Sequence, residues 1–153
     1  MVAAAALPML AQQGPINPKQ VALLRWYPAN VTTIFIDSWI VPYGAAFDGA
    51  NLWVADLSFN NGYDVTEIRP SDGALLGRFT IGTEPYGIAF DGADIWVANT
   101  SSNTVTKLRA SDGTVLGTFV VGTGPYGVAF DGATVWTGNR TDSNGPNWSV
   151  SKL

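Results

Sequence analysis

The stretch PYGIAFDGADIWVAN at residues 85–99 decides the fold of this chain. Nearly the same sequence stands at 42–56, PYGAAFDGANLWVAD, and at 125–139, PYGVAFDGATVWTGN. Self-similarity with a period of about 40 residues is typical of repeat architectures in which each repeat is one supersecondary unit. The chain is therefore predicted to contain three repeats, at 42–84, 85–124 and 125–153.

The middle repeat divides into four short runs rich in β-branched and aromatic residues. These runs are YGIAF (86–90), DIWVAN (94–99), TVTKLR (104–109) and TVLGTFVVG (114–122). Asp-Gly pairs separate the first run from the second and the third from the fourth, and such pairs favour tight hairpins because glycine takes positive φ without strain. Four antiparallel strands in about 40 residues predict one blade of a β-propeller.

Two motifs of the middle repeat resemble the repeats of the bacterial YVTN and NHL-like β-propellers. They are P-Y-G-x-A-F-D-G-A-x-x-W-V-A-N and T-V-T-K-L-R-A-S-D-G-T-V-L-G-T-F, and the resemblance covers roughly residues 33–153. It implies an all-β fold built from blades of four antiparallel strands. It implies little about function, because propellers host many activities. The family closes rings of six or seven blades in one chain, whereas this sequence carries three.

The sequence before the repeats divides into three segments. Residues 1–16 are predicted to be an apolar leader, either signal-like or disordered, which lacks the basic residues of a secretory signal. Residues 17–30 are predicted to form a short helix with Asn17 as its N-cap and Pro28 at its end. Residues 31–41 are β-rich, and they are predicted to form an N-terminal strand that completes a split blade, because the third repeat lacks its fourth run.

Three wedge-shaped blades do not close a ring, and they leave apolar faces and a strand edge uncovered. We therefore expect the chain to be its own partner. The favoured arrangement is a homodimer that closes a six-bladed ring by exchanging N-terminal strands. A larger ring is an alternative, and so is an extracellular filament or surface layer built by strand donation.

Composition excludes several classes of function. The net charge is −4 and no basic cluster is present, so a nucleic-acid partner is not expected. The chain has no histidine and no cysteine, so imidazole and thiolate chemistry are excluded, and no metal or other cofactor is predicted. No apolar run is long enough to span a bilayer. The expected location is secreted or at the bacterial cell surface.

Residues that recur in every repeat are expected to be structural. Two aromatic positions recur, and aromatic side chains bury large areas, so both are predicted to form the core between blades. These aromatic residues are Trp53, Trp96, Trp136, Phe47, Phe90 and Phe130. A third recurring position precedes a glycine and is predicted to form turns. Its residues are Asp48, Asp91 and Asp131.

Binding residues are predicted on two features. Tyr43, Tyr86 and Tyr126 open the innermost run of each repeat and would stand near the mouth of the channel, where they either stack on a sugar or planar ligand or simply pack. The loop between the second and third runs varies in length and lies on the same face, where binding residues concentrate. The predicted loop residues are Phe59, Asn60, Asn61, Tyr63, Asp142, Asn144 and Trp148.

The function predicted from these features is a non-enzymatic binding or scaffold module that presents a loop face to a glycan, peptide or protein partner. The alternative is an enzyme, because the virginiamycin B lyases have similar repeats. Their chemistry is associated with a histidine and a metal, and this chain has no histidine. Acid–base chemistry would then fall to the loop-face carboxylates Asp56, Asp64 and Asp142.

Overall fold

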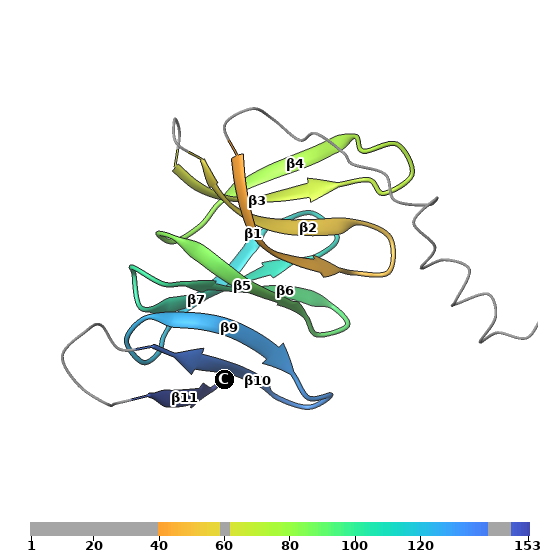
Figure 1. Ribbon diagram of the computed structural model, residues 1–153. Coiled ribbons are helices and arrows are strands. Elements are labelled where there is room, and N and C mark those ends of the chain that lie inside the picture. The colour runs from red at the N-terminus through yellow and green to blue at the C-terminus, as the bar shows by residue number, and fades with distance from the viewer. Residues whose placement is uncertain (1–39, 59–61, 141–147) are drawn as a thin grey trace, which may run out of the picture. The chain divides into compact units, whose positions relative to one another are not determined.

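A computed structural model of the chain describes residues 40–58, 62–140 and 148–153 (Figure 1). The chain divides into two units, Met1–Ile34 and Phe35–Leu153, and all described residues belong to the second unit. The described residues form strands β1 to β11 and contain no helix. The predicted leader, the predicted helix and most of the predicted strand at 31–41 lie outside the described residues.

The strands form three separate antiparallel sheets, which we call blades one, two and three. Blade one contains β1 (Ile40–Phe47), β2 (Leu52–Ser58), β3 (Gly62–Ile68) and β4 (Leu75–Thr80). Blade two contains β5 (Pro85–Phe90), β6 (Asp94–Asn99), β7 (Thr104–Arg109) and β8 (Val115–Val120). Blade three contains β9 (Pro125–Phe130), β10 (Val135–Asn139) and β11 (Ser149–Lys152). This confirms the predicted all-β fold with propeller-like blades.

The blades stack face to face along the chain. β5 contacts both β1 and β9, so the first strands of the three blades run next to one another (Figure 1). Within each blade the strands pair in sequence order from this inner strand outward. Ile40 and Val41 pair with Ser58 and Leu57, and they are therefore the first residues of the inner strand β1.

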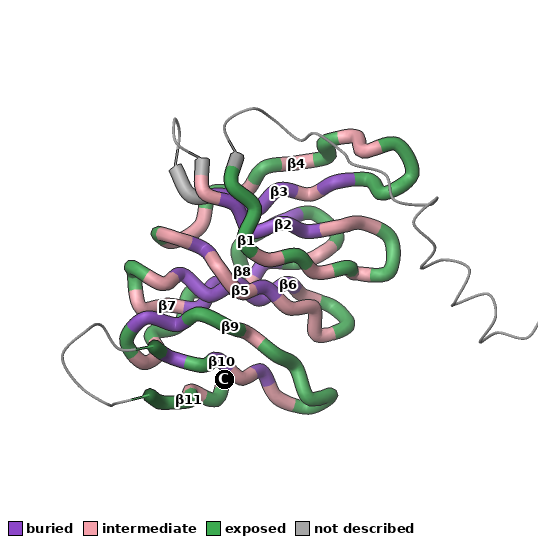
Figure 2. The backbone as a smooth tube through the Cα atoms, in the orientation of Figure 1, coloured by how far each residue is buried: buried purple, intermediate pink, exposed green. Residues whose placement is uncertain are grey.

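Apolar side chains are buried between blades rather than inside each one. The first cluster contains Trp53, Ala55 and Val65 of blade one with Ile88, Ile95, Val97 and Leu108 of blade two. The second contains Trp96, Val105 and Val135, with Val121, Val128 and Leu153 packed against it. Buried segments accordingly concentrate in the middle strands (Figure 2). Because removing apolar surface from water is the main favourable term in folding, each blade is stabilised by its neighbour.

The predicted aromatic core is confirmed at some of its residues and wrong at others. Trp53 and Trp96 are buried as predicted and Phe90 packs against the first cluster, but Phe47 and Phe130 are 55% and 36% exposed. The alternation of side chains along β1 places Ala46, rather than Phe47, on the side that packs against the core shared with blade two. The ring that stacks on Trp53 comes instead from Phe79 of β4, with 5.4 Å between centroids.

Candidate functional site

The three inner strands bring their tyrosines into one row, which we call the tyrosine column. The ring centroids of Tyr43 and Tyr86 lie 4.2 Å apart with their planes tilted by 49°, and those of Tyr86 and Tyr126 lie 4.5 Å apart and are stacked with 27° between their planes. A hydrogen bond with Tyr43 raises the pKa of the Tyr86 hydroxyl. The tyrosines singled out in the sequence therefore stand together, and their role in binding stays a prediction.

The glycine after each tyrosine lets neighbouring inner strands approach closely. A Cβ atom on Gly44 would lie 2.3 Å from the carbonyl oxygen of Tyr86, and one on Gly87 would lie 2.4 Å from that of Tyr126. These distances are far below van der Waals contact, so a side chain at either position would push the blades apart. Around Gly127, by contrast, no described atom lies within 4 Å of such a Cβ.

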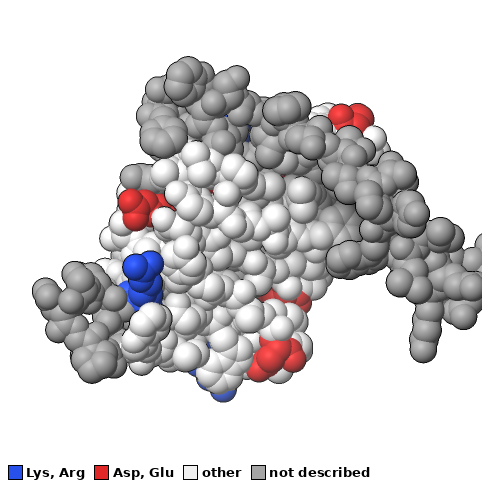
Figure 3. Space-filling model, viewed as in Figure 1, with Lys and Arg blue, Asp and Glu red and all other residues white. Residues whose placement is uncertain are grey.

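A shallow hollow of about 320 Å³ runs along the tyrosine column. Its lining is uncharged and comes entirely from the inner strands: Tyr43, Gly44, Ala45, Tyr86, Gly87, Ile88, Tyr126, Gly127 and Val128. The face of the molecule in Figure 3 is correspondingly uncharged at its centre, with charged groups toward its edges. The rings at the two ends of the column, Tyr43 and Tyr126, are 43% and 45% exposed.

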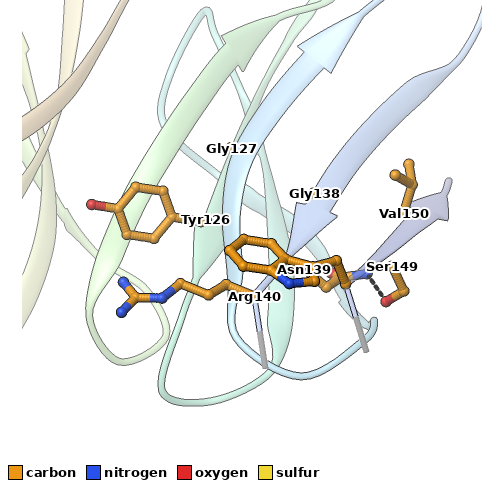
Figure 4. Close-up of a pocket in the computed structure, with 8 residues that line it drawn as sticks. Tyr126, Gly127, Gly138, Asn139, Arg140, Ser149 and Val150 are labelled. Atoms are coloured by element: carbon orange, nitrogen blue, oxygen red, sulfur yellow. Dashed lines mark hydrogen bonds between the residues drawn. The ribbon is translucent and has the colours of Figure 1, made fainter. Parts of the chain in front are cut away.

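A second and larger hollow, of about 700 Å³, lies on the open side of blade three. It is lined by Tyr126, Gly127, Gly138, Asn139, Arg140, Trp148, Ser149 and Val150. Tyr126 and Arg140 lie at one side of this hollow, and Ser149 and Val150 at the other (Figure 4). In blades one and two, the matching sheet face carries the inner strand of the next blade, as the contacts β2 with β5 and β6 with β9 record.

The Asp-Gly turns are tied to the core by a recurring hydrogen bond. Oδ1 of Asp91 accepts from the backbone N–H groups of Ala93 and Asp94, while Oδ2 accepts from the Trp96 indole at 2.7 Å. The same bonds recur in blade one at Asp48 and in blade three at Asp131. The predicted turn role is therefore confirmed, and sequence reasoning missed the bond to the indole. The invariant spacing D-G-A-x-x-W was the signal that could have revealed it.

These hydrogen bonds lower the pKa of the three turn aspartates. The indole N–H of Trp136, together with two turn amides, lowers the pKa of Asp131. Burial alone would raise the pKa of Asp48 and Asp91, but the hydrogen bonds outweigh it and the pKa of each lies below its ordinary value. These carboxylates are consequently held as anions and are committed to structure.

The last residue of β6 and of β10 is a buried asparagine that links two strands. Nδ2 of Asn99 donates to the Thr104 hydroxyl at 3.1 Å and to the Thr106 hydroxyl at 2.8 Å. Nδ2 of Asn139 donates in the same way to the Ser149 and Ser151 hydroxyls, at 3.0 Å and 2.9 Å. An amide with two hydroxyl acceptors is thus the rule at this position of a blade.

Blade one breaks this rule by placing two carboxyl groups there. Asp56 occupies the asparagine position and Asp64 stands directly opposite it on β3. Asp56 is fully buried; its Oδ2 accepts from the Thr66 hydroxyl at 2.5 Å, and Oδ1 has no hydrogen-bond partner among the described residues. Burial, reinforced by the charge of Asp64, raises the pKa of Asp56. Both carboxylates were predicted to lie on the loop face, and the structure buries them where β2 and β3 pair.

The structure describes only some of the other predicted loop residues. Phe59, Asn60, Asn61, Asp142 and Asn144 lie outside the described residues. The backbone of Tyr63 pairs with Leu57, and Trp148 is 77% exposed beside the larger hollow. Within 40–58, 62–140 and 148–153, no group of three or more acidic residues could hold a metal ion. No helix in those ranges is long and apolar enough to cross a membrane.

Comparison with known proteins supports the fold. No protein-family model and no curated protein matches the chain. Among solved structures, it is similar to the hydrazine synthase of Kuenenia stuttgartiensis, with 22% identity and a TM-score of 0.59 over 70% of this chain and 31% of that one. The PQQ-bound aldose sugar dehydrogenase of Streptomyces coelicolor gives 16% identity and a TM-score of 0.58 over 72% and 42%. A luciferin-regenerating enzyme gives 18% and 0.53 over 73% and 44%.

These similarities show a β-propeller-type fold and nothing finer, because all the identities are low. The chain spans less than half the length of each of these structures. They also correct one expectation. We predicted a protein that is not an enzyme, yet chains with this fold include a sugar dehydrogenase and a luciferin-regenerating enzyme. The propeller repeats therefore give no ground for excluding catalysis.

Proposed function

We propose that this chain is a β-propeller module that binds a ligand on the tyrosine column. The observation that carries the proposal is the row of Tyr43, Tyr86 and Tyr126, with neighbouring centroids 4.2 and 4.5 Å apart, along an open hollow of about 320 Å³. Tyr86 and Tyr126 turn their ring faces toward each other and so present their edges and hydroxyl groups outward, and the Tyr43 ring packs against Tyr86 with a tilt of 49°. A ligand in the hollow would therefore meet a row of phenol hydroxyls above glycine backbone.

The lining suggests the class of ligand. No charged residue lines the hollow, so it offers nothing to compensate the desolvation of a charged ligand. Each phenol hydroxyl both donates and accepts, which matches the hydroxyl groups of a sugar. We therefore propose a neutral glycan as the ligand class.

Titration with neutral oligosaccharides of glucose, mannose and N-acetylglucosamine, followed by calorimetry, tests this proposal. Tyr43→Phe and Tyr126→Phe keep the rings and remove one hydroxyl each, so we expect each to weaken binding about 2- to 10-fold. Ser111→Ala, which removes a hydroxyl from an exposed turn, is the control and should bind like the wild type. Absence of binding, or equal binding by all variants, would reject the glycan.

The YVTN/NHL-like class of the repeats belongs to the same proposal. Its support is the P-Y-G-x-A-F-D-G motif, in which glycine allows close strand approach and aspartate holds the turn and the tryptophan. Those roles depend on blade packing, so the motif is tied to the architecture rather than to a particular ligand.

A further inference from the structure

The open side of blade three is built like a seat for one more inner strand. We propose that a second copy of this chain fills it with its own β1, so that Pro42, Tyr43 and Gly44 of that copy lie against β9 and β10. The inference rests on how blades one and two receive their neighbours, and it is independent of the proposed ligand.

The two occupied seats show what the occupant looks like. In each, the inner strand of the next blade begins with Pro-Tyr-Gly and places its tyrosine carbonyl over the glycine of the strand below. Blade two also fixes its occupant by a polar contact, because the Thr100 hydroxyl donates to the carbonyl oxygen of Pro125 at 2.6 Å. The two seats share a glycine and an apolar sheet face, and blade two adds a donor at its rim where blade one has Leu57.

Blade three has the same glycine and sheet face, but no strand among the described residues covers them. Val150 is 67% exposed, whereas Val105, its counterpart in blade two, is completely buried. No described atom lies within 4 Å of where a Cβ of Gly127 or Gly138 would stand. Arg140 follows the buried asparagine just as Thr100 does, and it lines the hollow.

A second copy offers the complementary surface. β1 begins its repeat with Pro-Tyr-Gly like the two strands already seated, and its Tyr43 ring is as exposed as the Tyr126 ring at the other end of the column. Bringing Tyr43 of one copy onto Tyr126 of another continues the tyrosine column through the contact. The seat and the seated strand lie on different parts of the chain, so the contact is heterologous and either closes into a ring or extends into a filament.

Two glycines on the same face give a matched test. Gly127 corresponds to Gly44 and Gly87, where an added Cβ would collide with the arriving strand, so Gly127→Ala should block the seat. Gly138 corresponds to Ala55 and Ala98, which are buried beneath seated strands, so Gly138→Ala should leave the seat usable. Both alanines enter open space in the single chain, and neither position requires a positive φ.

The experiment is size-exclusion chromatography with light scattering on the full chain and both variants. We expect the wild type and Gly138→Ala to be multiples of 16.2 kDa, and Gly127→Ala to fall to the single-chain mass with an unchanged circular dichroism spectrum. Val150→Asp, which would bury a charge in the contact, should act like Gly127→Ala. If the wild type forms very large species and Gly127→Ala does not, the seat is supported and the contact builds a filament rather than a closed ring. A wild-type monomer at about 50 μM, a concentration well above the micromolar range, or Gly127→Ala that assembles normally, would overturn the proposal.

Discussion

At the scale of single residues, the aspartate of each Asp-Gly turn combines two roles that the sequence displays as one. Its first carboxylate oxygen closes the turn and its second holds the indole of the tryptophan five residues later, as at Asp91 and Trp96. Turn propensity predicts the first role. The second depends on the hairpin bringing the indole back over the turn, and local propensity does not contain that information.

Asp91→Asn should destabilise the fold by about 1–2 kcal/mol, because the amide turns a donor toward the indole N–H and removes a charge-assisted bond. The loss should also depend on pH. The folded pKa of Asp91 lies below its ordinary 3.8, so the contribution is present above that value and disappears as pH falls through the folded pKa. Urea unfolding at pH 7 and pH 3 measures both effects. Asp112→Asn, in an exposed turn, is the control and should cost less.

Asp56 makes the stability of the fold depend on pH with the opposite sign. Its folded pKa is raised, so the folded chain binds the proton more tightly and stability declines as pH rises from about the ordinary 3.8 through the folded pKa. Asp56→Asn restores the amide that Asn99 and Asn139 carry, and it should stabilise the protein at pH 7 by about 1–3 kcal/mol while flattening that decline. The reciprocal change Asn99→Asp should destabilise at pH 7 and less so in acid. Equal unfolding midpoints for Asp56→Asn and the wild type at pH 7 would contradict this account.

At the scale of elements, the strands could be predicted closely because each is short, alternating and bounded by turn residues. The runs at 94–99 and 104–109 coincide with β6 and β7, and the run at 114–122 contains β8. Burial was harder to predict, since recurrence of a residue does not say whether a neighbouring blade covers it. Phe47 shows this, because it is 55% exposed whereas Phe90, at the same position of blade two, packs against the first cluster. The sequence also did not reveal the carboxyl pair of Asp56 and Asp64, because only the pairing register of β2 and β3 shows that these residues lie opposite each other.

The outer strands should contribute to stability in proportion to the neighbour that covers them. Phe79 of β4 stacks on Trp53 and meets Gly113 in the turn of blade two, whereas Phe119 of β8 packs against Trp96 in a tilted arrangement and stays 40% exposed. Phe79→Ala should therefore cost about 3 kcal/mol, and Phe119→Ala about half of that. Chemical unfolding of the two variants checks the order. Equal losses would show that the stack with tryptophan, rather than the contact between blades, carries the stabilisation.

At the scale of the whole molecule, a stack of blades is stabilised by nearest neighbours, so the last blade is the weakest unless another covers it. If a second copy seats on blade three, folding and association are linked, and the unfolding midpoint must rise with protein concentration. We expect the midpoint of the wild type to rise by several degrees between about 1 and 100 μM, since a hundredfold change in concentration is worth about 2.7 kcal/mol. Gly127→Ala should melt at one temperature across that range, and Gly138→Ala should follow the wild type. A wild-type midpoint that stays constant would mean that blade three of this chain is stable with its face open and with Val150 and Trp148 exposed to solvent.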